Sequence, residues 1–445
     1  MKKLNFIIKY GLALLLLSFY SCESWLNVTP SDRLSEEMLF NDREGFVKAL
    51  NGVYIELNTN ELYGRNLTAG ALDVMGQYYS VASSSHAFYN YGGLVYTGND
   101  EKALFDNMWQ KCYAVIACCN TIIEKCDENK AGLSPVWRGS IKGEALALRA
   151  MLHFDMLRLF GPLTSELDKE SIPYQTNSDQ TVTPLLSGSE VVGLILDDLK
   201  NAVGLLKDTD PYFVEEEFSD TDLNYRRFRM NYFAAKGLMA RVQLWGGDKE
   251  KAAATAKEVI AEGQAEGAEF FPFVTNSEAT SSNPDRVFYS EVLFGTYHSS
   301  REKLHEDLFA PTLESTSILT LAGTARRDDL YDNENDYRYS VWSTYNKNGT
   351  SVLYHLKFEK QDNVTASRQY MIPLIRMSEM YLIAVECCKL DEASVYLNTF
   401  RNARNCNSLA LTEDNRINIL ANEYKKEMLG EGQLFFFYKR QEMVN

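Results

Sequence analysis

Two tyrosine-rich segments, within residues 58–100 and 337–348, contain the side chains best suited to binding a ligand. The candidate ligand-binding residues are Tyr78, Tyr79, Tyr89, Asn90, Tyr91, Tyr96, Trp342 and Tyr345. Aromatic rings offer flat, weakly apolar faces, and neighbouring amides and hydroxyls can fix the orientation of a bound ligand. The segments therefore predict a ligand-binding face, with Tyr89, Tyr91 and Trp342 as its best candidates. The alternative is that the rings hold long loops on the scaffold.

The sequence contains none of the short motifs that usually indicate catalysis. There is no Walker-type glycine loop, no G-x-S-x-G elbow and no H-E-x-x-H pair. The chain has 61 aspartates and glutamates, so a carboxylate pair for sugar hydrolysis is easy to find and carries little information. We therefore predict that the protein is not an enzyme and uses no cofactor. A glycoside hydrolase with unmarked carboxylates is the alternative.

One short acidic segment, Asp220, Asp222 and Asn224, resembles the start of a calcium-binding loop. The sixth position of such a loop is Tyr225 instead of glycine, and the twelfth is Asn231 instead of glutamate. We expect a solvated acidic turn and no metal site, with these three residues as a weak calcium candidate.

The N-terminus carries the pattern of an export signal. Three lysines precede and flank the start of a short apolar run over residues 10–20, and Cys22 follows directly. We predict that residues 1–21 are a signal peptide and that Cys22 is lipidated, which would anchor the protein to a membrane. An ordinary signal cleaved near Ser21 is the alternative.

The charge balance excludes some partners. The chain has 45 basic and 61 acidic residues, a net charge of −16. Nucleic acids and anionic lipid surfaces both require a basic face, so neither is expected as a partner.

Apolar residues recur at helical spacing through much of the chain. They predict helices over 101–127, 141–160, 188–206 and 415–430. Cys112, Cys119 and Cys126 follow one another every seven residues, so they should form a buried stripe on the first helix. In the third helix, we expect Asp197 and Asp198 on the solvated side.

Two stretches predict helical hairpins. In residues 230–263, a helix ends at a Gly-Gly turn, and Asp248 can cap the next helix. This unit has about the length of a tetratricopeptide repeat, ~34 residues, and a similar plan recurs over 374–404. The predicted fold is mostly α: a tetratricopeptide-like helical-hairpin scaffold with a long irregular loop face and a few short strands.

The loop face should come from residues 58–100 and 264–372, where Arg286–Phe294 could form a strand. We expect one compact unit with an N-terminal region over 22–229 and a C-terminal region over 230–445.

Several sequence blocks, taken in order, resemble the SusD/RagB family of outer-membrane nutrient-binding lipoproteins from Bacteroidetes. The blocks are Trp25–Asp32, Leu34–Glu37, Ala49–Tyr54, Trp109 to Asn120, Arg149–Ala150, Leu159–Pro162, Ala234–Arg241, Gly247–Asp248, Pro373–Leu382, Glu386, Glu423, Glu431–Gly432 and Lys439–Arg440. Each block is weak alone, and together they extend from just after Cys22 to residue 440.

The resemblance implies a surface-exposed outer-membrane lipoprotein that binds glycan without cleaving it. It implies a SusC-like TonB-dependent transporter as partner, which would receive the captured oligosaccharide. In this family, the loops before the Trp109 helix and before the Pro373 segment help to form the sugar site. Trp109, Arg149 and Arg376 are expected to serve the scaffold. A protein-binding helical-repeat lipoprotein is a further alternative.

Overall fold

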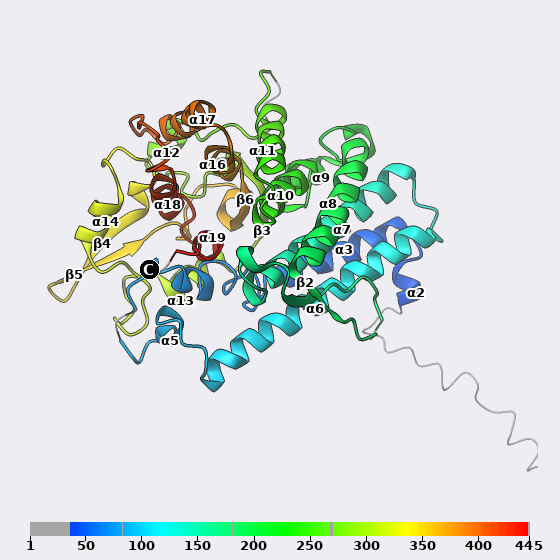
Figure 1. Ribbon diagram of the computed structural model, residues 1–445, viewed down its shortest axis with the longest axis horizontal. Coiled ribbons are helices and arrows are strands. Elements are labelled where there is room, and N and C mark those ends of the chain that lie inside the picture. The colour runs from blue at the N-terminus through cyan, green and yellow to red at the C-terminus, as the bar shows by residue number, and fades with distance from the viewer. Residues whose placement is uncertain (1–35, 82, 180, 268–269, 444–445) are drawn as a thin grey trace, which may run out of the picture.

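Helices build most of the part of the chain that the computed structural model describes, which is residues 36–443 except 82, 180 and 268–269 (Figure 1). The helices are α2 (Glu36–Leu39), α3 (Arg43–Leu57), α4 (Ala71–Met75), α5 (Tyr89–Gly92), α6 (Asn99–Glu128), α7 (Pro135–Phe160), α8 (Gly188–Thr209), α9 (Asp220–Asn224), α10 (Tyr232–Trp245), α11 (Lys249–Gly263), α12 (Asn276–Thr280), α13 (Arg301–Leu308), α14 (Thr324–Leu330), α15 (Ala366–Tyr370), α16 (Met377–Cys387), α17 (Leu390–Asn402), α18 (Arg416–Glu427) and α19 (Gln433–Gln441). The strands are β1 (Glu170–Pro173), β2 (Leu185–Ser187), β3 (Val292–Tyr297), β4 (Trp342–Lys347), β5 (Thr350–His355) and β6 (Met371–Arg376).

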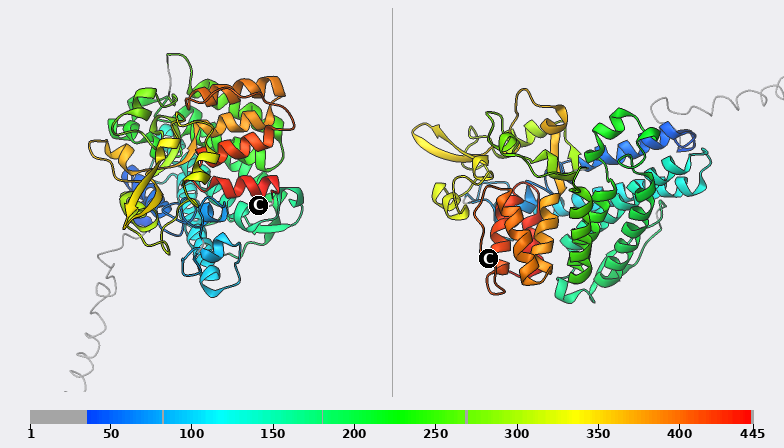
Figure 2. Two further views of the ribbon diagram at one scale, coloured as in Figure 1. Left: turned by 90° about the vertical axis from the view of Figure 1, so that its left-hand side faces the viewer. Right: turned by 90° about the horizontal axis from the view of Figure 1, so that it is seen from above.

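The long helices form a series of packed hairpins. Helix α7 packs against α6 and α8, α8 packs against α10, and α11 joins the α10 hairpin to α16 and α17. Figure 2 shows the helices of these hairpins stacked beside one another. The predicted mostly α, tetratricopeptide-like scaffold is confirmed.

Local sequence signals fix where these helices begin. Ser187 accepts a hydrogen bond from the backbone N–H of Glu190, whose side chain accepts one from the Ser187 N–H in return. Asp248 caps α11 as predicted, by accepting from the Lys251 N–H. Helix α7 starts earlier than predicted, because Ser134 caps it and Pro135 occupies its first turn, where a proline costs no hydrogen bond.

The predicted cysteine stripe is confirmed. Cys112, Cys119 and Cys126 are all fully buried on α6, where they pack as small apolar side chains.

The prediction for Asp198 was wrong, because Asp197 is exposed but Asp198 faces the core. Its two carboxylate oxygens accept hydrogen bonds of 2.7 Å each from Arg149, and one of them also accepts from the Tyr174 hydroxyl at 2.6 Å. Adjacent residues on a helix are turned about 100° from each other, so two neighbouring acids need not share a face. Arg149 therefore holds α7 to α8, which confirms its predicted role in the scaffold.

Three two-stranded antiparallel sheets lie between the helices: β1 with β2, β3 with β6, and β4 with β5. The strand expected over Arg286–Phe294 begins only at Val292 and continues to Tyr297. The earlier part cannot extend as a strand, because Phe288 has a left-handed backbone (φ 53°) and Asp285 caps the turn around it.

The irregular loop face lies at the end of the molecule opposite α2. Helices α5, α13 and α14 and the β4–β5 hairpin lie there (Figure 1). Residues 342–347 were expected in a loop but form β4, which pairs along its whole length with β5.

Candidate functional site

The first two candidate tyrosines, Tyr78 and Tyr79, are buried in the core. The Tyr78 hydroxyl donates to the backbone carbonyl of Tyr424 at 2.9 Å. The Tyr79 ring stacks on His355 with centroids 6.1 Å apart. In this arrangement they hold their segment on the scaffold, and neither ring is presented to solvent as the ligand hypothesis would require.

Asp73 fixes the same segment from inside. Its two carboxylate oxygens accept hydrogen bonds from the backbone N–H groups of Gly430 (2.6 Å) and Gly432 (2.9 Å). Burial raises the pKa of Asp73 to about 7, although both N–H groups act in the opposite direction. Residues 58–100 are thus tied directly to the chain that leads into α19.

Gly432, one of the family-like blocks of the sequence, has a physical reason to be glycine. Its φ is 68°, a conformation that L side chains rarely adopt. A Cβ there would also lie 2.3 Å from the carbonyl oxygen of Leu67. The close contact between Gly432 and Leu67 is therefore possible only because residue 432 has no side chain.

His355 brings the two tyrosine-rich segments together. Its ring lies 6.1 Å from that of Tyr79 and 5.5 Å from that of Trp342. Trp342 is only 6% exposed, and its Nε1–H donates to the Tyr331 hydroxyl at 3.2 Å. Trp342 is therefore a core residue at the base of the β4–β5 hairpin and not the surface ring that the sequence suggested.

The remaining candidates divide by exposure. Tyr89 (42%) and Tyr345 (43%) are exposed, and so is Asn90, whose amide donates to Glu101 at 2.9 Å. Tyr91 is buried between Phe88 and Phe105, and Tyr96 packs edge-on against Phe105. Burial raises the pKa of both Tyr91 and Tyr96 to about 12.

A cavity of about 590 Å³ opens beside Tyr91, and we call it the loop groove. One wall is residues 85–88 with Tyr91, and the other is the end of α13 with residues 316–317. Arg65, Asp100 and Leu104 complete the lining. Its lining residues include Tyr91 of α5 and the last two residues of α13, helices that both lie on the irregular face (Figure 1).

The loop groove combines apolar rings with hydrogen-bonding groups of several kinds. The rings are those of Phe88 and Tyr91, and the hydroxyls come from Ser85, Thr316 and Ser317. Within the described part of the chain, the Arg65 guanidinium forms no ion pair and donates only to the neighbouring Asn66, at 3.3 Å. Small-molecule sites usually combine apolar and aromatic side chains with a small number of convergent polar groups, and the loop groove contains both kinds.

His86 also lines the loop groove. Its Nδ1 accepts from the Phe88 backbone N–H at 3.0 Å, so the proton of the neutral ring lies on Nε2. Nε2 is buried, and the ring lies against the backbone of Ser317 and Ile318. Burial lowers the pKa of His86, which favours this uncharged form, although that backbone acts to raise it.

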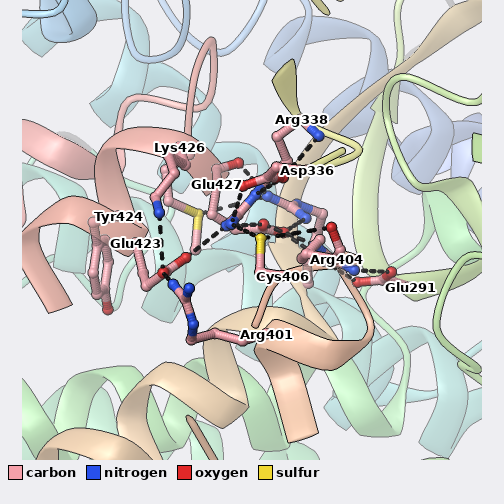
Figure 3. Close-up of polar contacts among 12 residues, drawn as sticks. Glu291, Asp336, Arg338, Arg401, Arg404, Cys406, Glu423, Tyr424, Lys426 and Glu427 are labelled. Atoms are coloured by element: carbon pink, nitrogen blue, oxygen red, sulfur yellow. Dashed lines mark hydrogen bonds and ion pairs between the residues drawn. The ribbon is translucent and has the colours of Figure 1, made fainter. Parts of the chain in front are cut away.

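A buried ion network fixes the segment that leads into the β4–β5 hairpin (Figure 3). Glu427 of α18 pairs with Arg376 of β6, with Arg404 (2.7 Å) and with Arg338 (3.2 Å). Arg338 in turn binds Asp336, immediately before the hairpin, at 2.8 Å. The surrounding guanidinium groups hold the pKa of Glu427 well below its ordinary value against the effect of burial.

The same network confirms that Arg376 serves the scaffold. It is 2% exposed, and besides Glu427 it binds Glu431, with Nε donating at 3.0 Å. Trp109 packs against Tyr113 and Phe160, with centroids 4.7 and 5.2 Å apart.

The calcium candidate is part of a helix. Asp220, Asp222 and Asn224 lie on α9, where Asp222 accepts from the backbone and hydroxyl of Ser219 as part of a capping box. Over the described ranges, no three histidine, cysteine or acidic side chains are gathered where they could hold a metal ion.

The predicted signal peptide and Cys22 lie outside the described residues. None of the described helices is both long enough and apolar enough to cross a membrane.

Comparisons with known proteins give the family. Residues 24–244 match a profile described as SusD-like, "starch-binding associating with outer membrane", and residues 296–444 match the SusD family profile. SusD-like protein P2 of Formosa agariphila is 25% identical over 265 residues, which cover 58% of this chain and 46% of that protein. The chain thus spans about half the length of this curated relative.

Solved structures agree on the fold. A SusD-like carbohydrate binding protein from Bacteroides vulgatus is 22% identical, with a TM-score of 0.71 over 91% of this chain and 84% of that one. A structure described as a laminarin binding SusD-like protein is 17% identical, with a TM-score of 0.65 over 90% of this chain and 92% of that one. With both profiles and the fold in agreement, the chain belongs to the SusD/RagB family.

Proposed function

We propose that the protein captures oligosaccharide at the outer membrane and passes it to a SusC-like TonB-dependent transporter, without cleaving it. The observation that carries the proposal is the loop groove, where the rings of Phe88 and Tyr91 lie among hydroxyls and the Arg65 guanidinium, which has no ion pair with the described residues. A sugar offers weakly apolar C–H faces to rings and hydroxyls to each of those groups.

We propose Tyr89, Asn90 and Tyr345 as surface contacts for the glycan, since all three side chains are exposed. Tyr89 and Asn90 stand in the chain between Phe88 and Tyr91, which line the groove. Tyr78, Tyr79, Tyr96 and Trp342 take a supporting part, because their rings pack against the scaffold or each other, whereas Tyr91 lines the groove itself. Carbohydrate binding is supported by the structural relatives, which include a SusD-like carbohydrate binding protein and a laminarin binding SusD-like protein.

The proposal is tested with purified protein, a panel of neutral glycans that includes laminarin, and the variant Tyr89→Ala. Loss of an exposed stacking ring should weaken binding at least about tenfold, ~1.4 kcal/mol, with an unchanged Tm. The control is Val395→Ala, which shortens a more exposed apolar side chain (64%) on α17 and should change neither quantity. If Tyr89→Ala binds glycan as tightly as the wild type, Tyr89 is not part of the binding site. Release of shorter sugars from the glycan would show that the protein is a hydrolase.

Anchoring through Cys22 is tested by Cys22→Ala. Several acyl chains hold a bacterial lipoprotein almost permanently, since each buried methylene contributes ~0.8 kcal/mol. We expect the variant in the soluble fraction of the producing cell and Ser18→Ala in the membrane fraction, by immunoblot of both. Retention of Cys22→Ala on the membrane would contradict a lipid anchor at this residue.

A further inference from the structure

A second cavity, of about 470 Å³, lies on the helical scaffold away from the loop groove. It is enclosed by α3, the start of α7, the end of β3 and the segment 211–229, which includes α9. We call it the scaffold pocket. None of its lining residues belongs to the loop groove, so the two cavities can be altered independently.

Aromatic side chains form much of the wall of the scaffold pocket. They are Tyr54, Trp137, Phe218, Tyr225, Phe228 and Tyr297. Trp137 packs against Phe218 with centroids 4.5 Å apart, and Phe228 packs against Tyr297 at 5.2 Å. These contacts hold the rings in place before any ligand arrives.

The charged groups of the scaffold pocket compensate one another. Two carboxylates, Glu144 and Asp222, and two guanidinium groups, Arg226 and Arg229, line it, so their formal charges cancel. Glu144 binds Arg226 and accepts from the Tyr54 hydroxyl at 2.6 Å. Arg229 lies over the Tyr54 ring, 4.5 Å from its centroid. Because the pocket has no net formal charge, it offers an ionic ligand no opposite charge. This balance favours a neutral ligand.

Neutral polar groups, in contrast, are left without partners. Three lining residues have a buried polar atom with no hydrogen bond to any described residue: Asn58 Oδ1, Trp137 Nε1 and Thr296 Oγ1. Thr296 is only 2% exposed. Buried polar atoms are rarely left unsatisfied, because each loses its hydrogen bonds to water. Together they offer one acceptor, one donor and one hydroxyl that can do both.

We propose that the scaffold pocket is a second carbohydrate site, which binds a short stretch of neutral sugar through its rings and these three polar groups. Only a ligand with both apolar faces and several hydroxyls would use every part of this lining. The inference rests on the proposed function, since it gives the same protein two points of attachment to glycan. Two linked sites hold one long chain more tightly than either site alone.

The test uses the full mature protein with two substitutions against the loop groove: Arg65→Ala removes a guanidinium that lines it, and Tyr89→Ala removes the exposed ring that follows Phe88 in the chain. Ligand-detected NMR follows the binding of three neutral disaccharides, maltose, cellobiose and laminaribiose. We expect residual binding in this background and at least about tenfold weaker binding when Thr296→Val is added. Valine has the shape of threonine and removes a hydroxyl without a partner, so the Tm should not fall.

A second variant and a control keep the test decisive. Trp137→Phe keeps a ring but removes the indole N–H, and it should weaken binding in the same way. Thr209→Val removes a buried hydroxyl that already donates to the Leu205 carbonyl at 2.8 Å, outside the pocket, and should leave binding unchanged. Unchanged binding by both pocket variants, or no binding once the groove is disabled, would overturn the scaffold pocket and leave the loop groove standing. If the protein with an intact groove bound no glycan, the proposed function itself would fail.

Discussion

Replacing Glu427 by alanine should lower the free energy of unfolding by about 3–5 kcal/mol, because it leaves buried arginines without their counter-charge. Arg376 and Arg404 are both almost completely buried, and each pairs with Glu427. Urea unfolding followed by circular dichroism measures the change. The matched control is Glu413→Ala, which removes an exposed partner of Arg416 and should cost under about 1 kcal/mol.

The same carboxylate predicts acid sensitivity. The pKa of Glu427 is lower in the folded chain than in the unfolded one, so its pairing stabilises the fold above the ordinary glutamate pKa of about 4.3. That stability is lost as the pH falls further. The difference in unfolding free energy between the wild type and Glu427→Ala should therefore shrink in acid. A variant as stable as the wild type at neutral pH would contradict the network's role.

Asp73→Ala should cost about 2–5 kcal/mol, because it leaves the N–H groups of Gly430 and Gly432 without an acceptor. Hydrogen–deuterium exchange should then increase at residues 58–100 and around Gly432, because Asp73 joins these segments. Asp73→Asn is the matched control, since its single side-chain oxygen can accept only one of the two bonds without rearrangement. Its destabilisation should fall between those of the wild type and Asp73→Ala.

Asp73 also predicts a pH trend opposite to that of Glu427. Its pKa is about 7 in the folded chain against 3.8 ordinarily, so folding favours the protonated form. This contribution is complete below pH 3.8 and is lost as the pH rises through about 7. The stability of the wild type relative to Asp73→Asn should therefore decline between these values. A flat difference would show that Asp73 does not titrate in this range.

The scaffold could be predicted wherever local signals decide the structure. The stripe of Cys112, Cys119 and Cys126 follows from helical periodicity, and the start of α11 follows from Asp248 as a cap. Asp198 could not be placed, because its burial depends on Arg149, which lies 49 residues earlier in the chain. A local pattern contains no information on such a partner.

The candidate site was predicted less well for a related reason. Aromatic composition identified the two segments that meet at His355, but exposure depends on tertiary packing, so buried Tyr91 and Trp342 looked the same as exposed Tyr89. Arg65 and His86 carried no compositional signal, and they line the groove only because the distant end of α13 packs opposite them.

Hydrogen–deuterium exchange with and without a bound neutral glycan shows directly whether the loop groove is the binding site. We expect slower exchange in residues 83–91 and 314–319, which include parts of both walls of the loop groove, and smaller protection after Tyr89→Ala. Glycan binding that leaves the exchange of both walls unchanged would contradict the loop groove as the binding site.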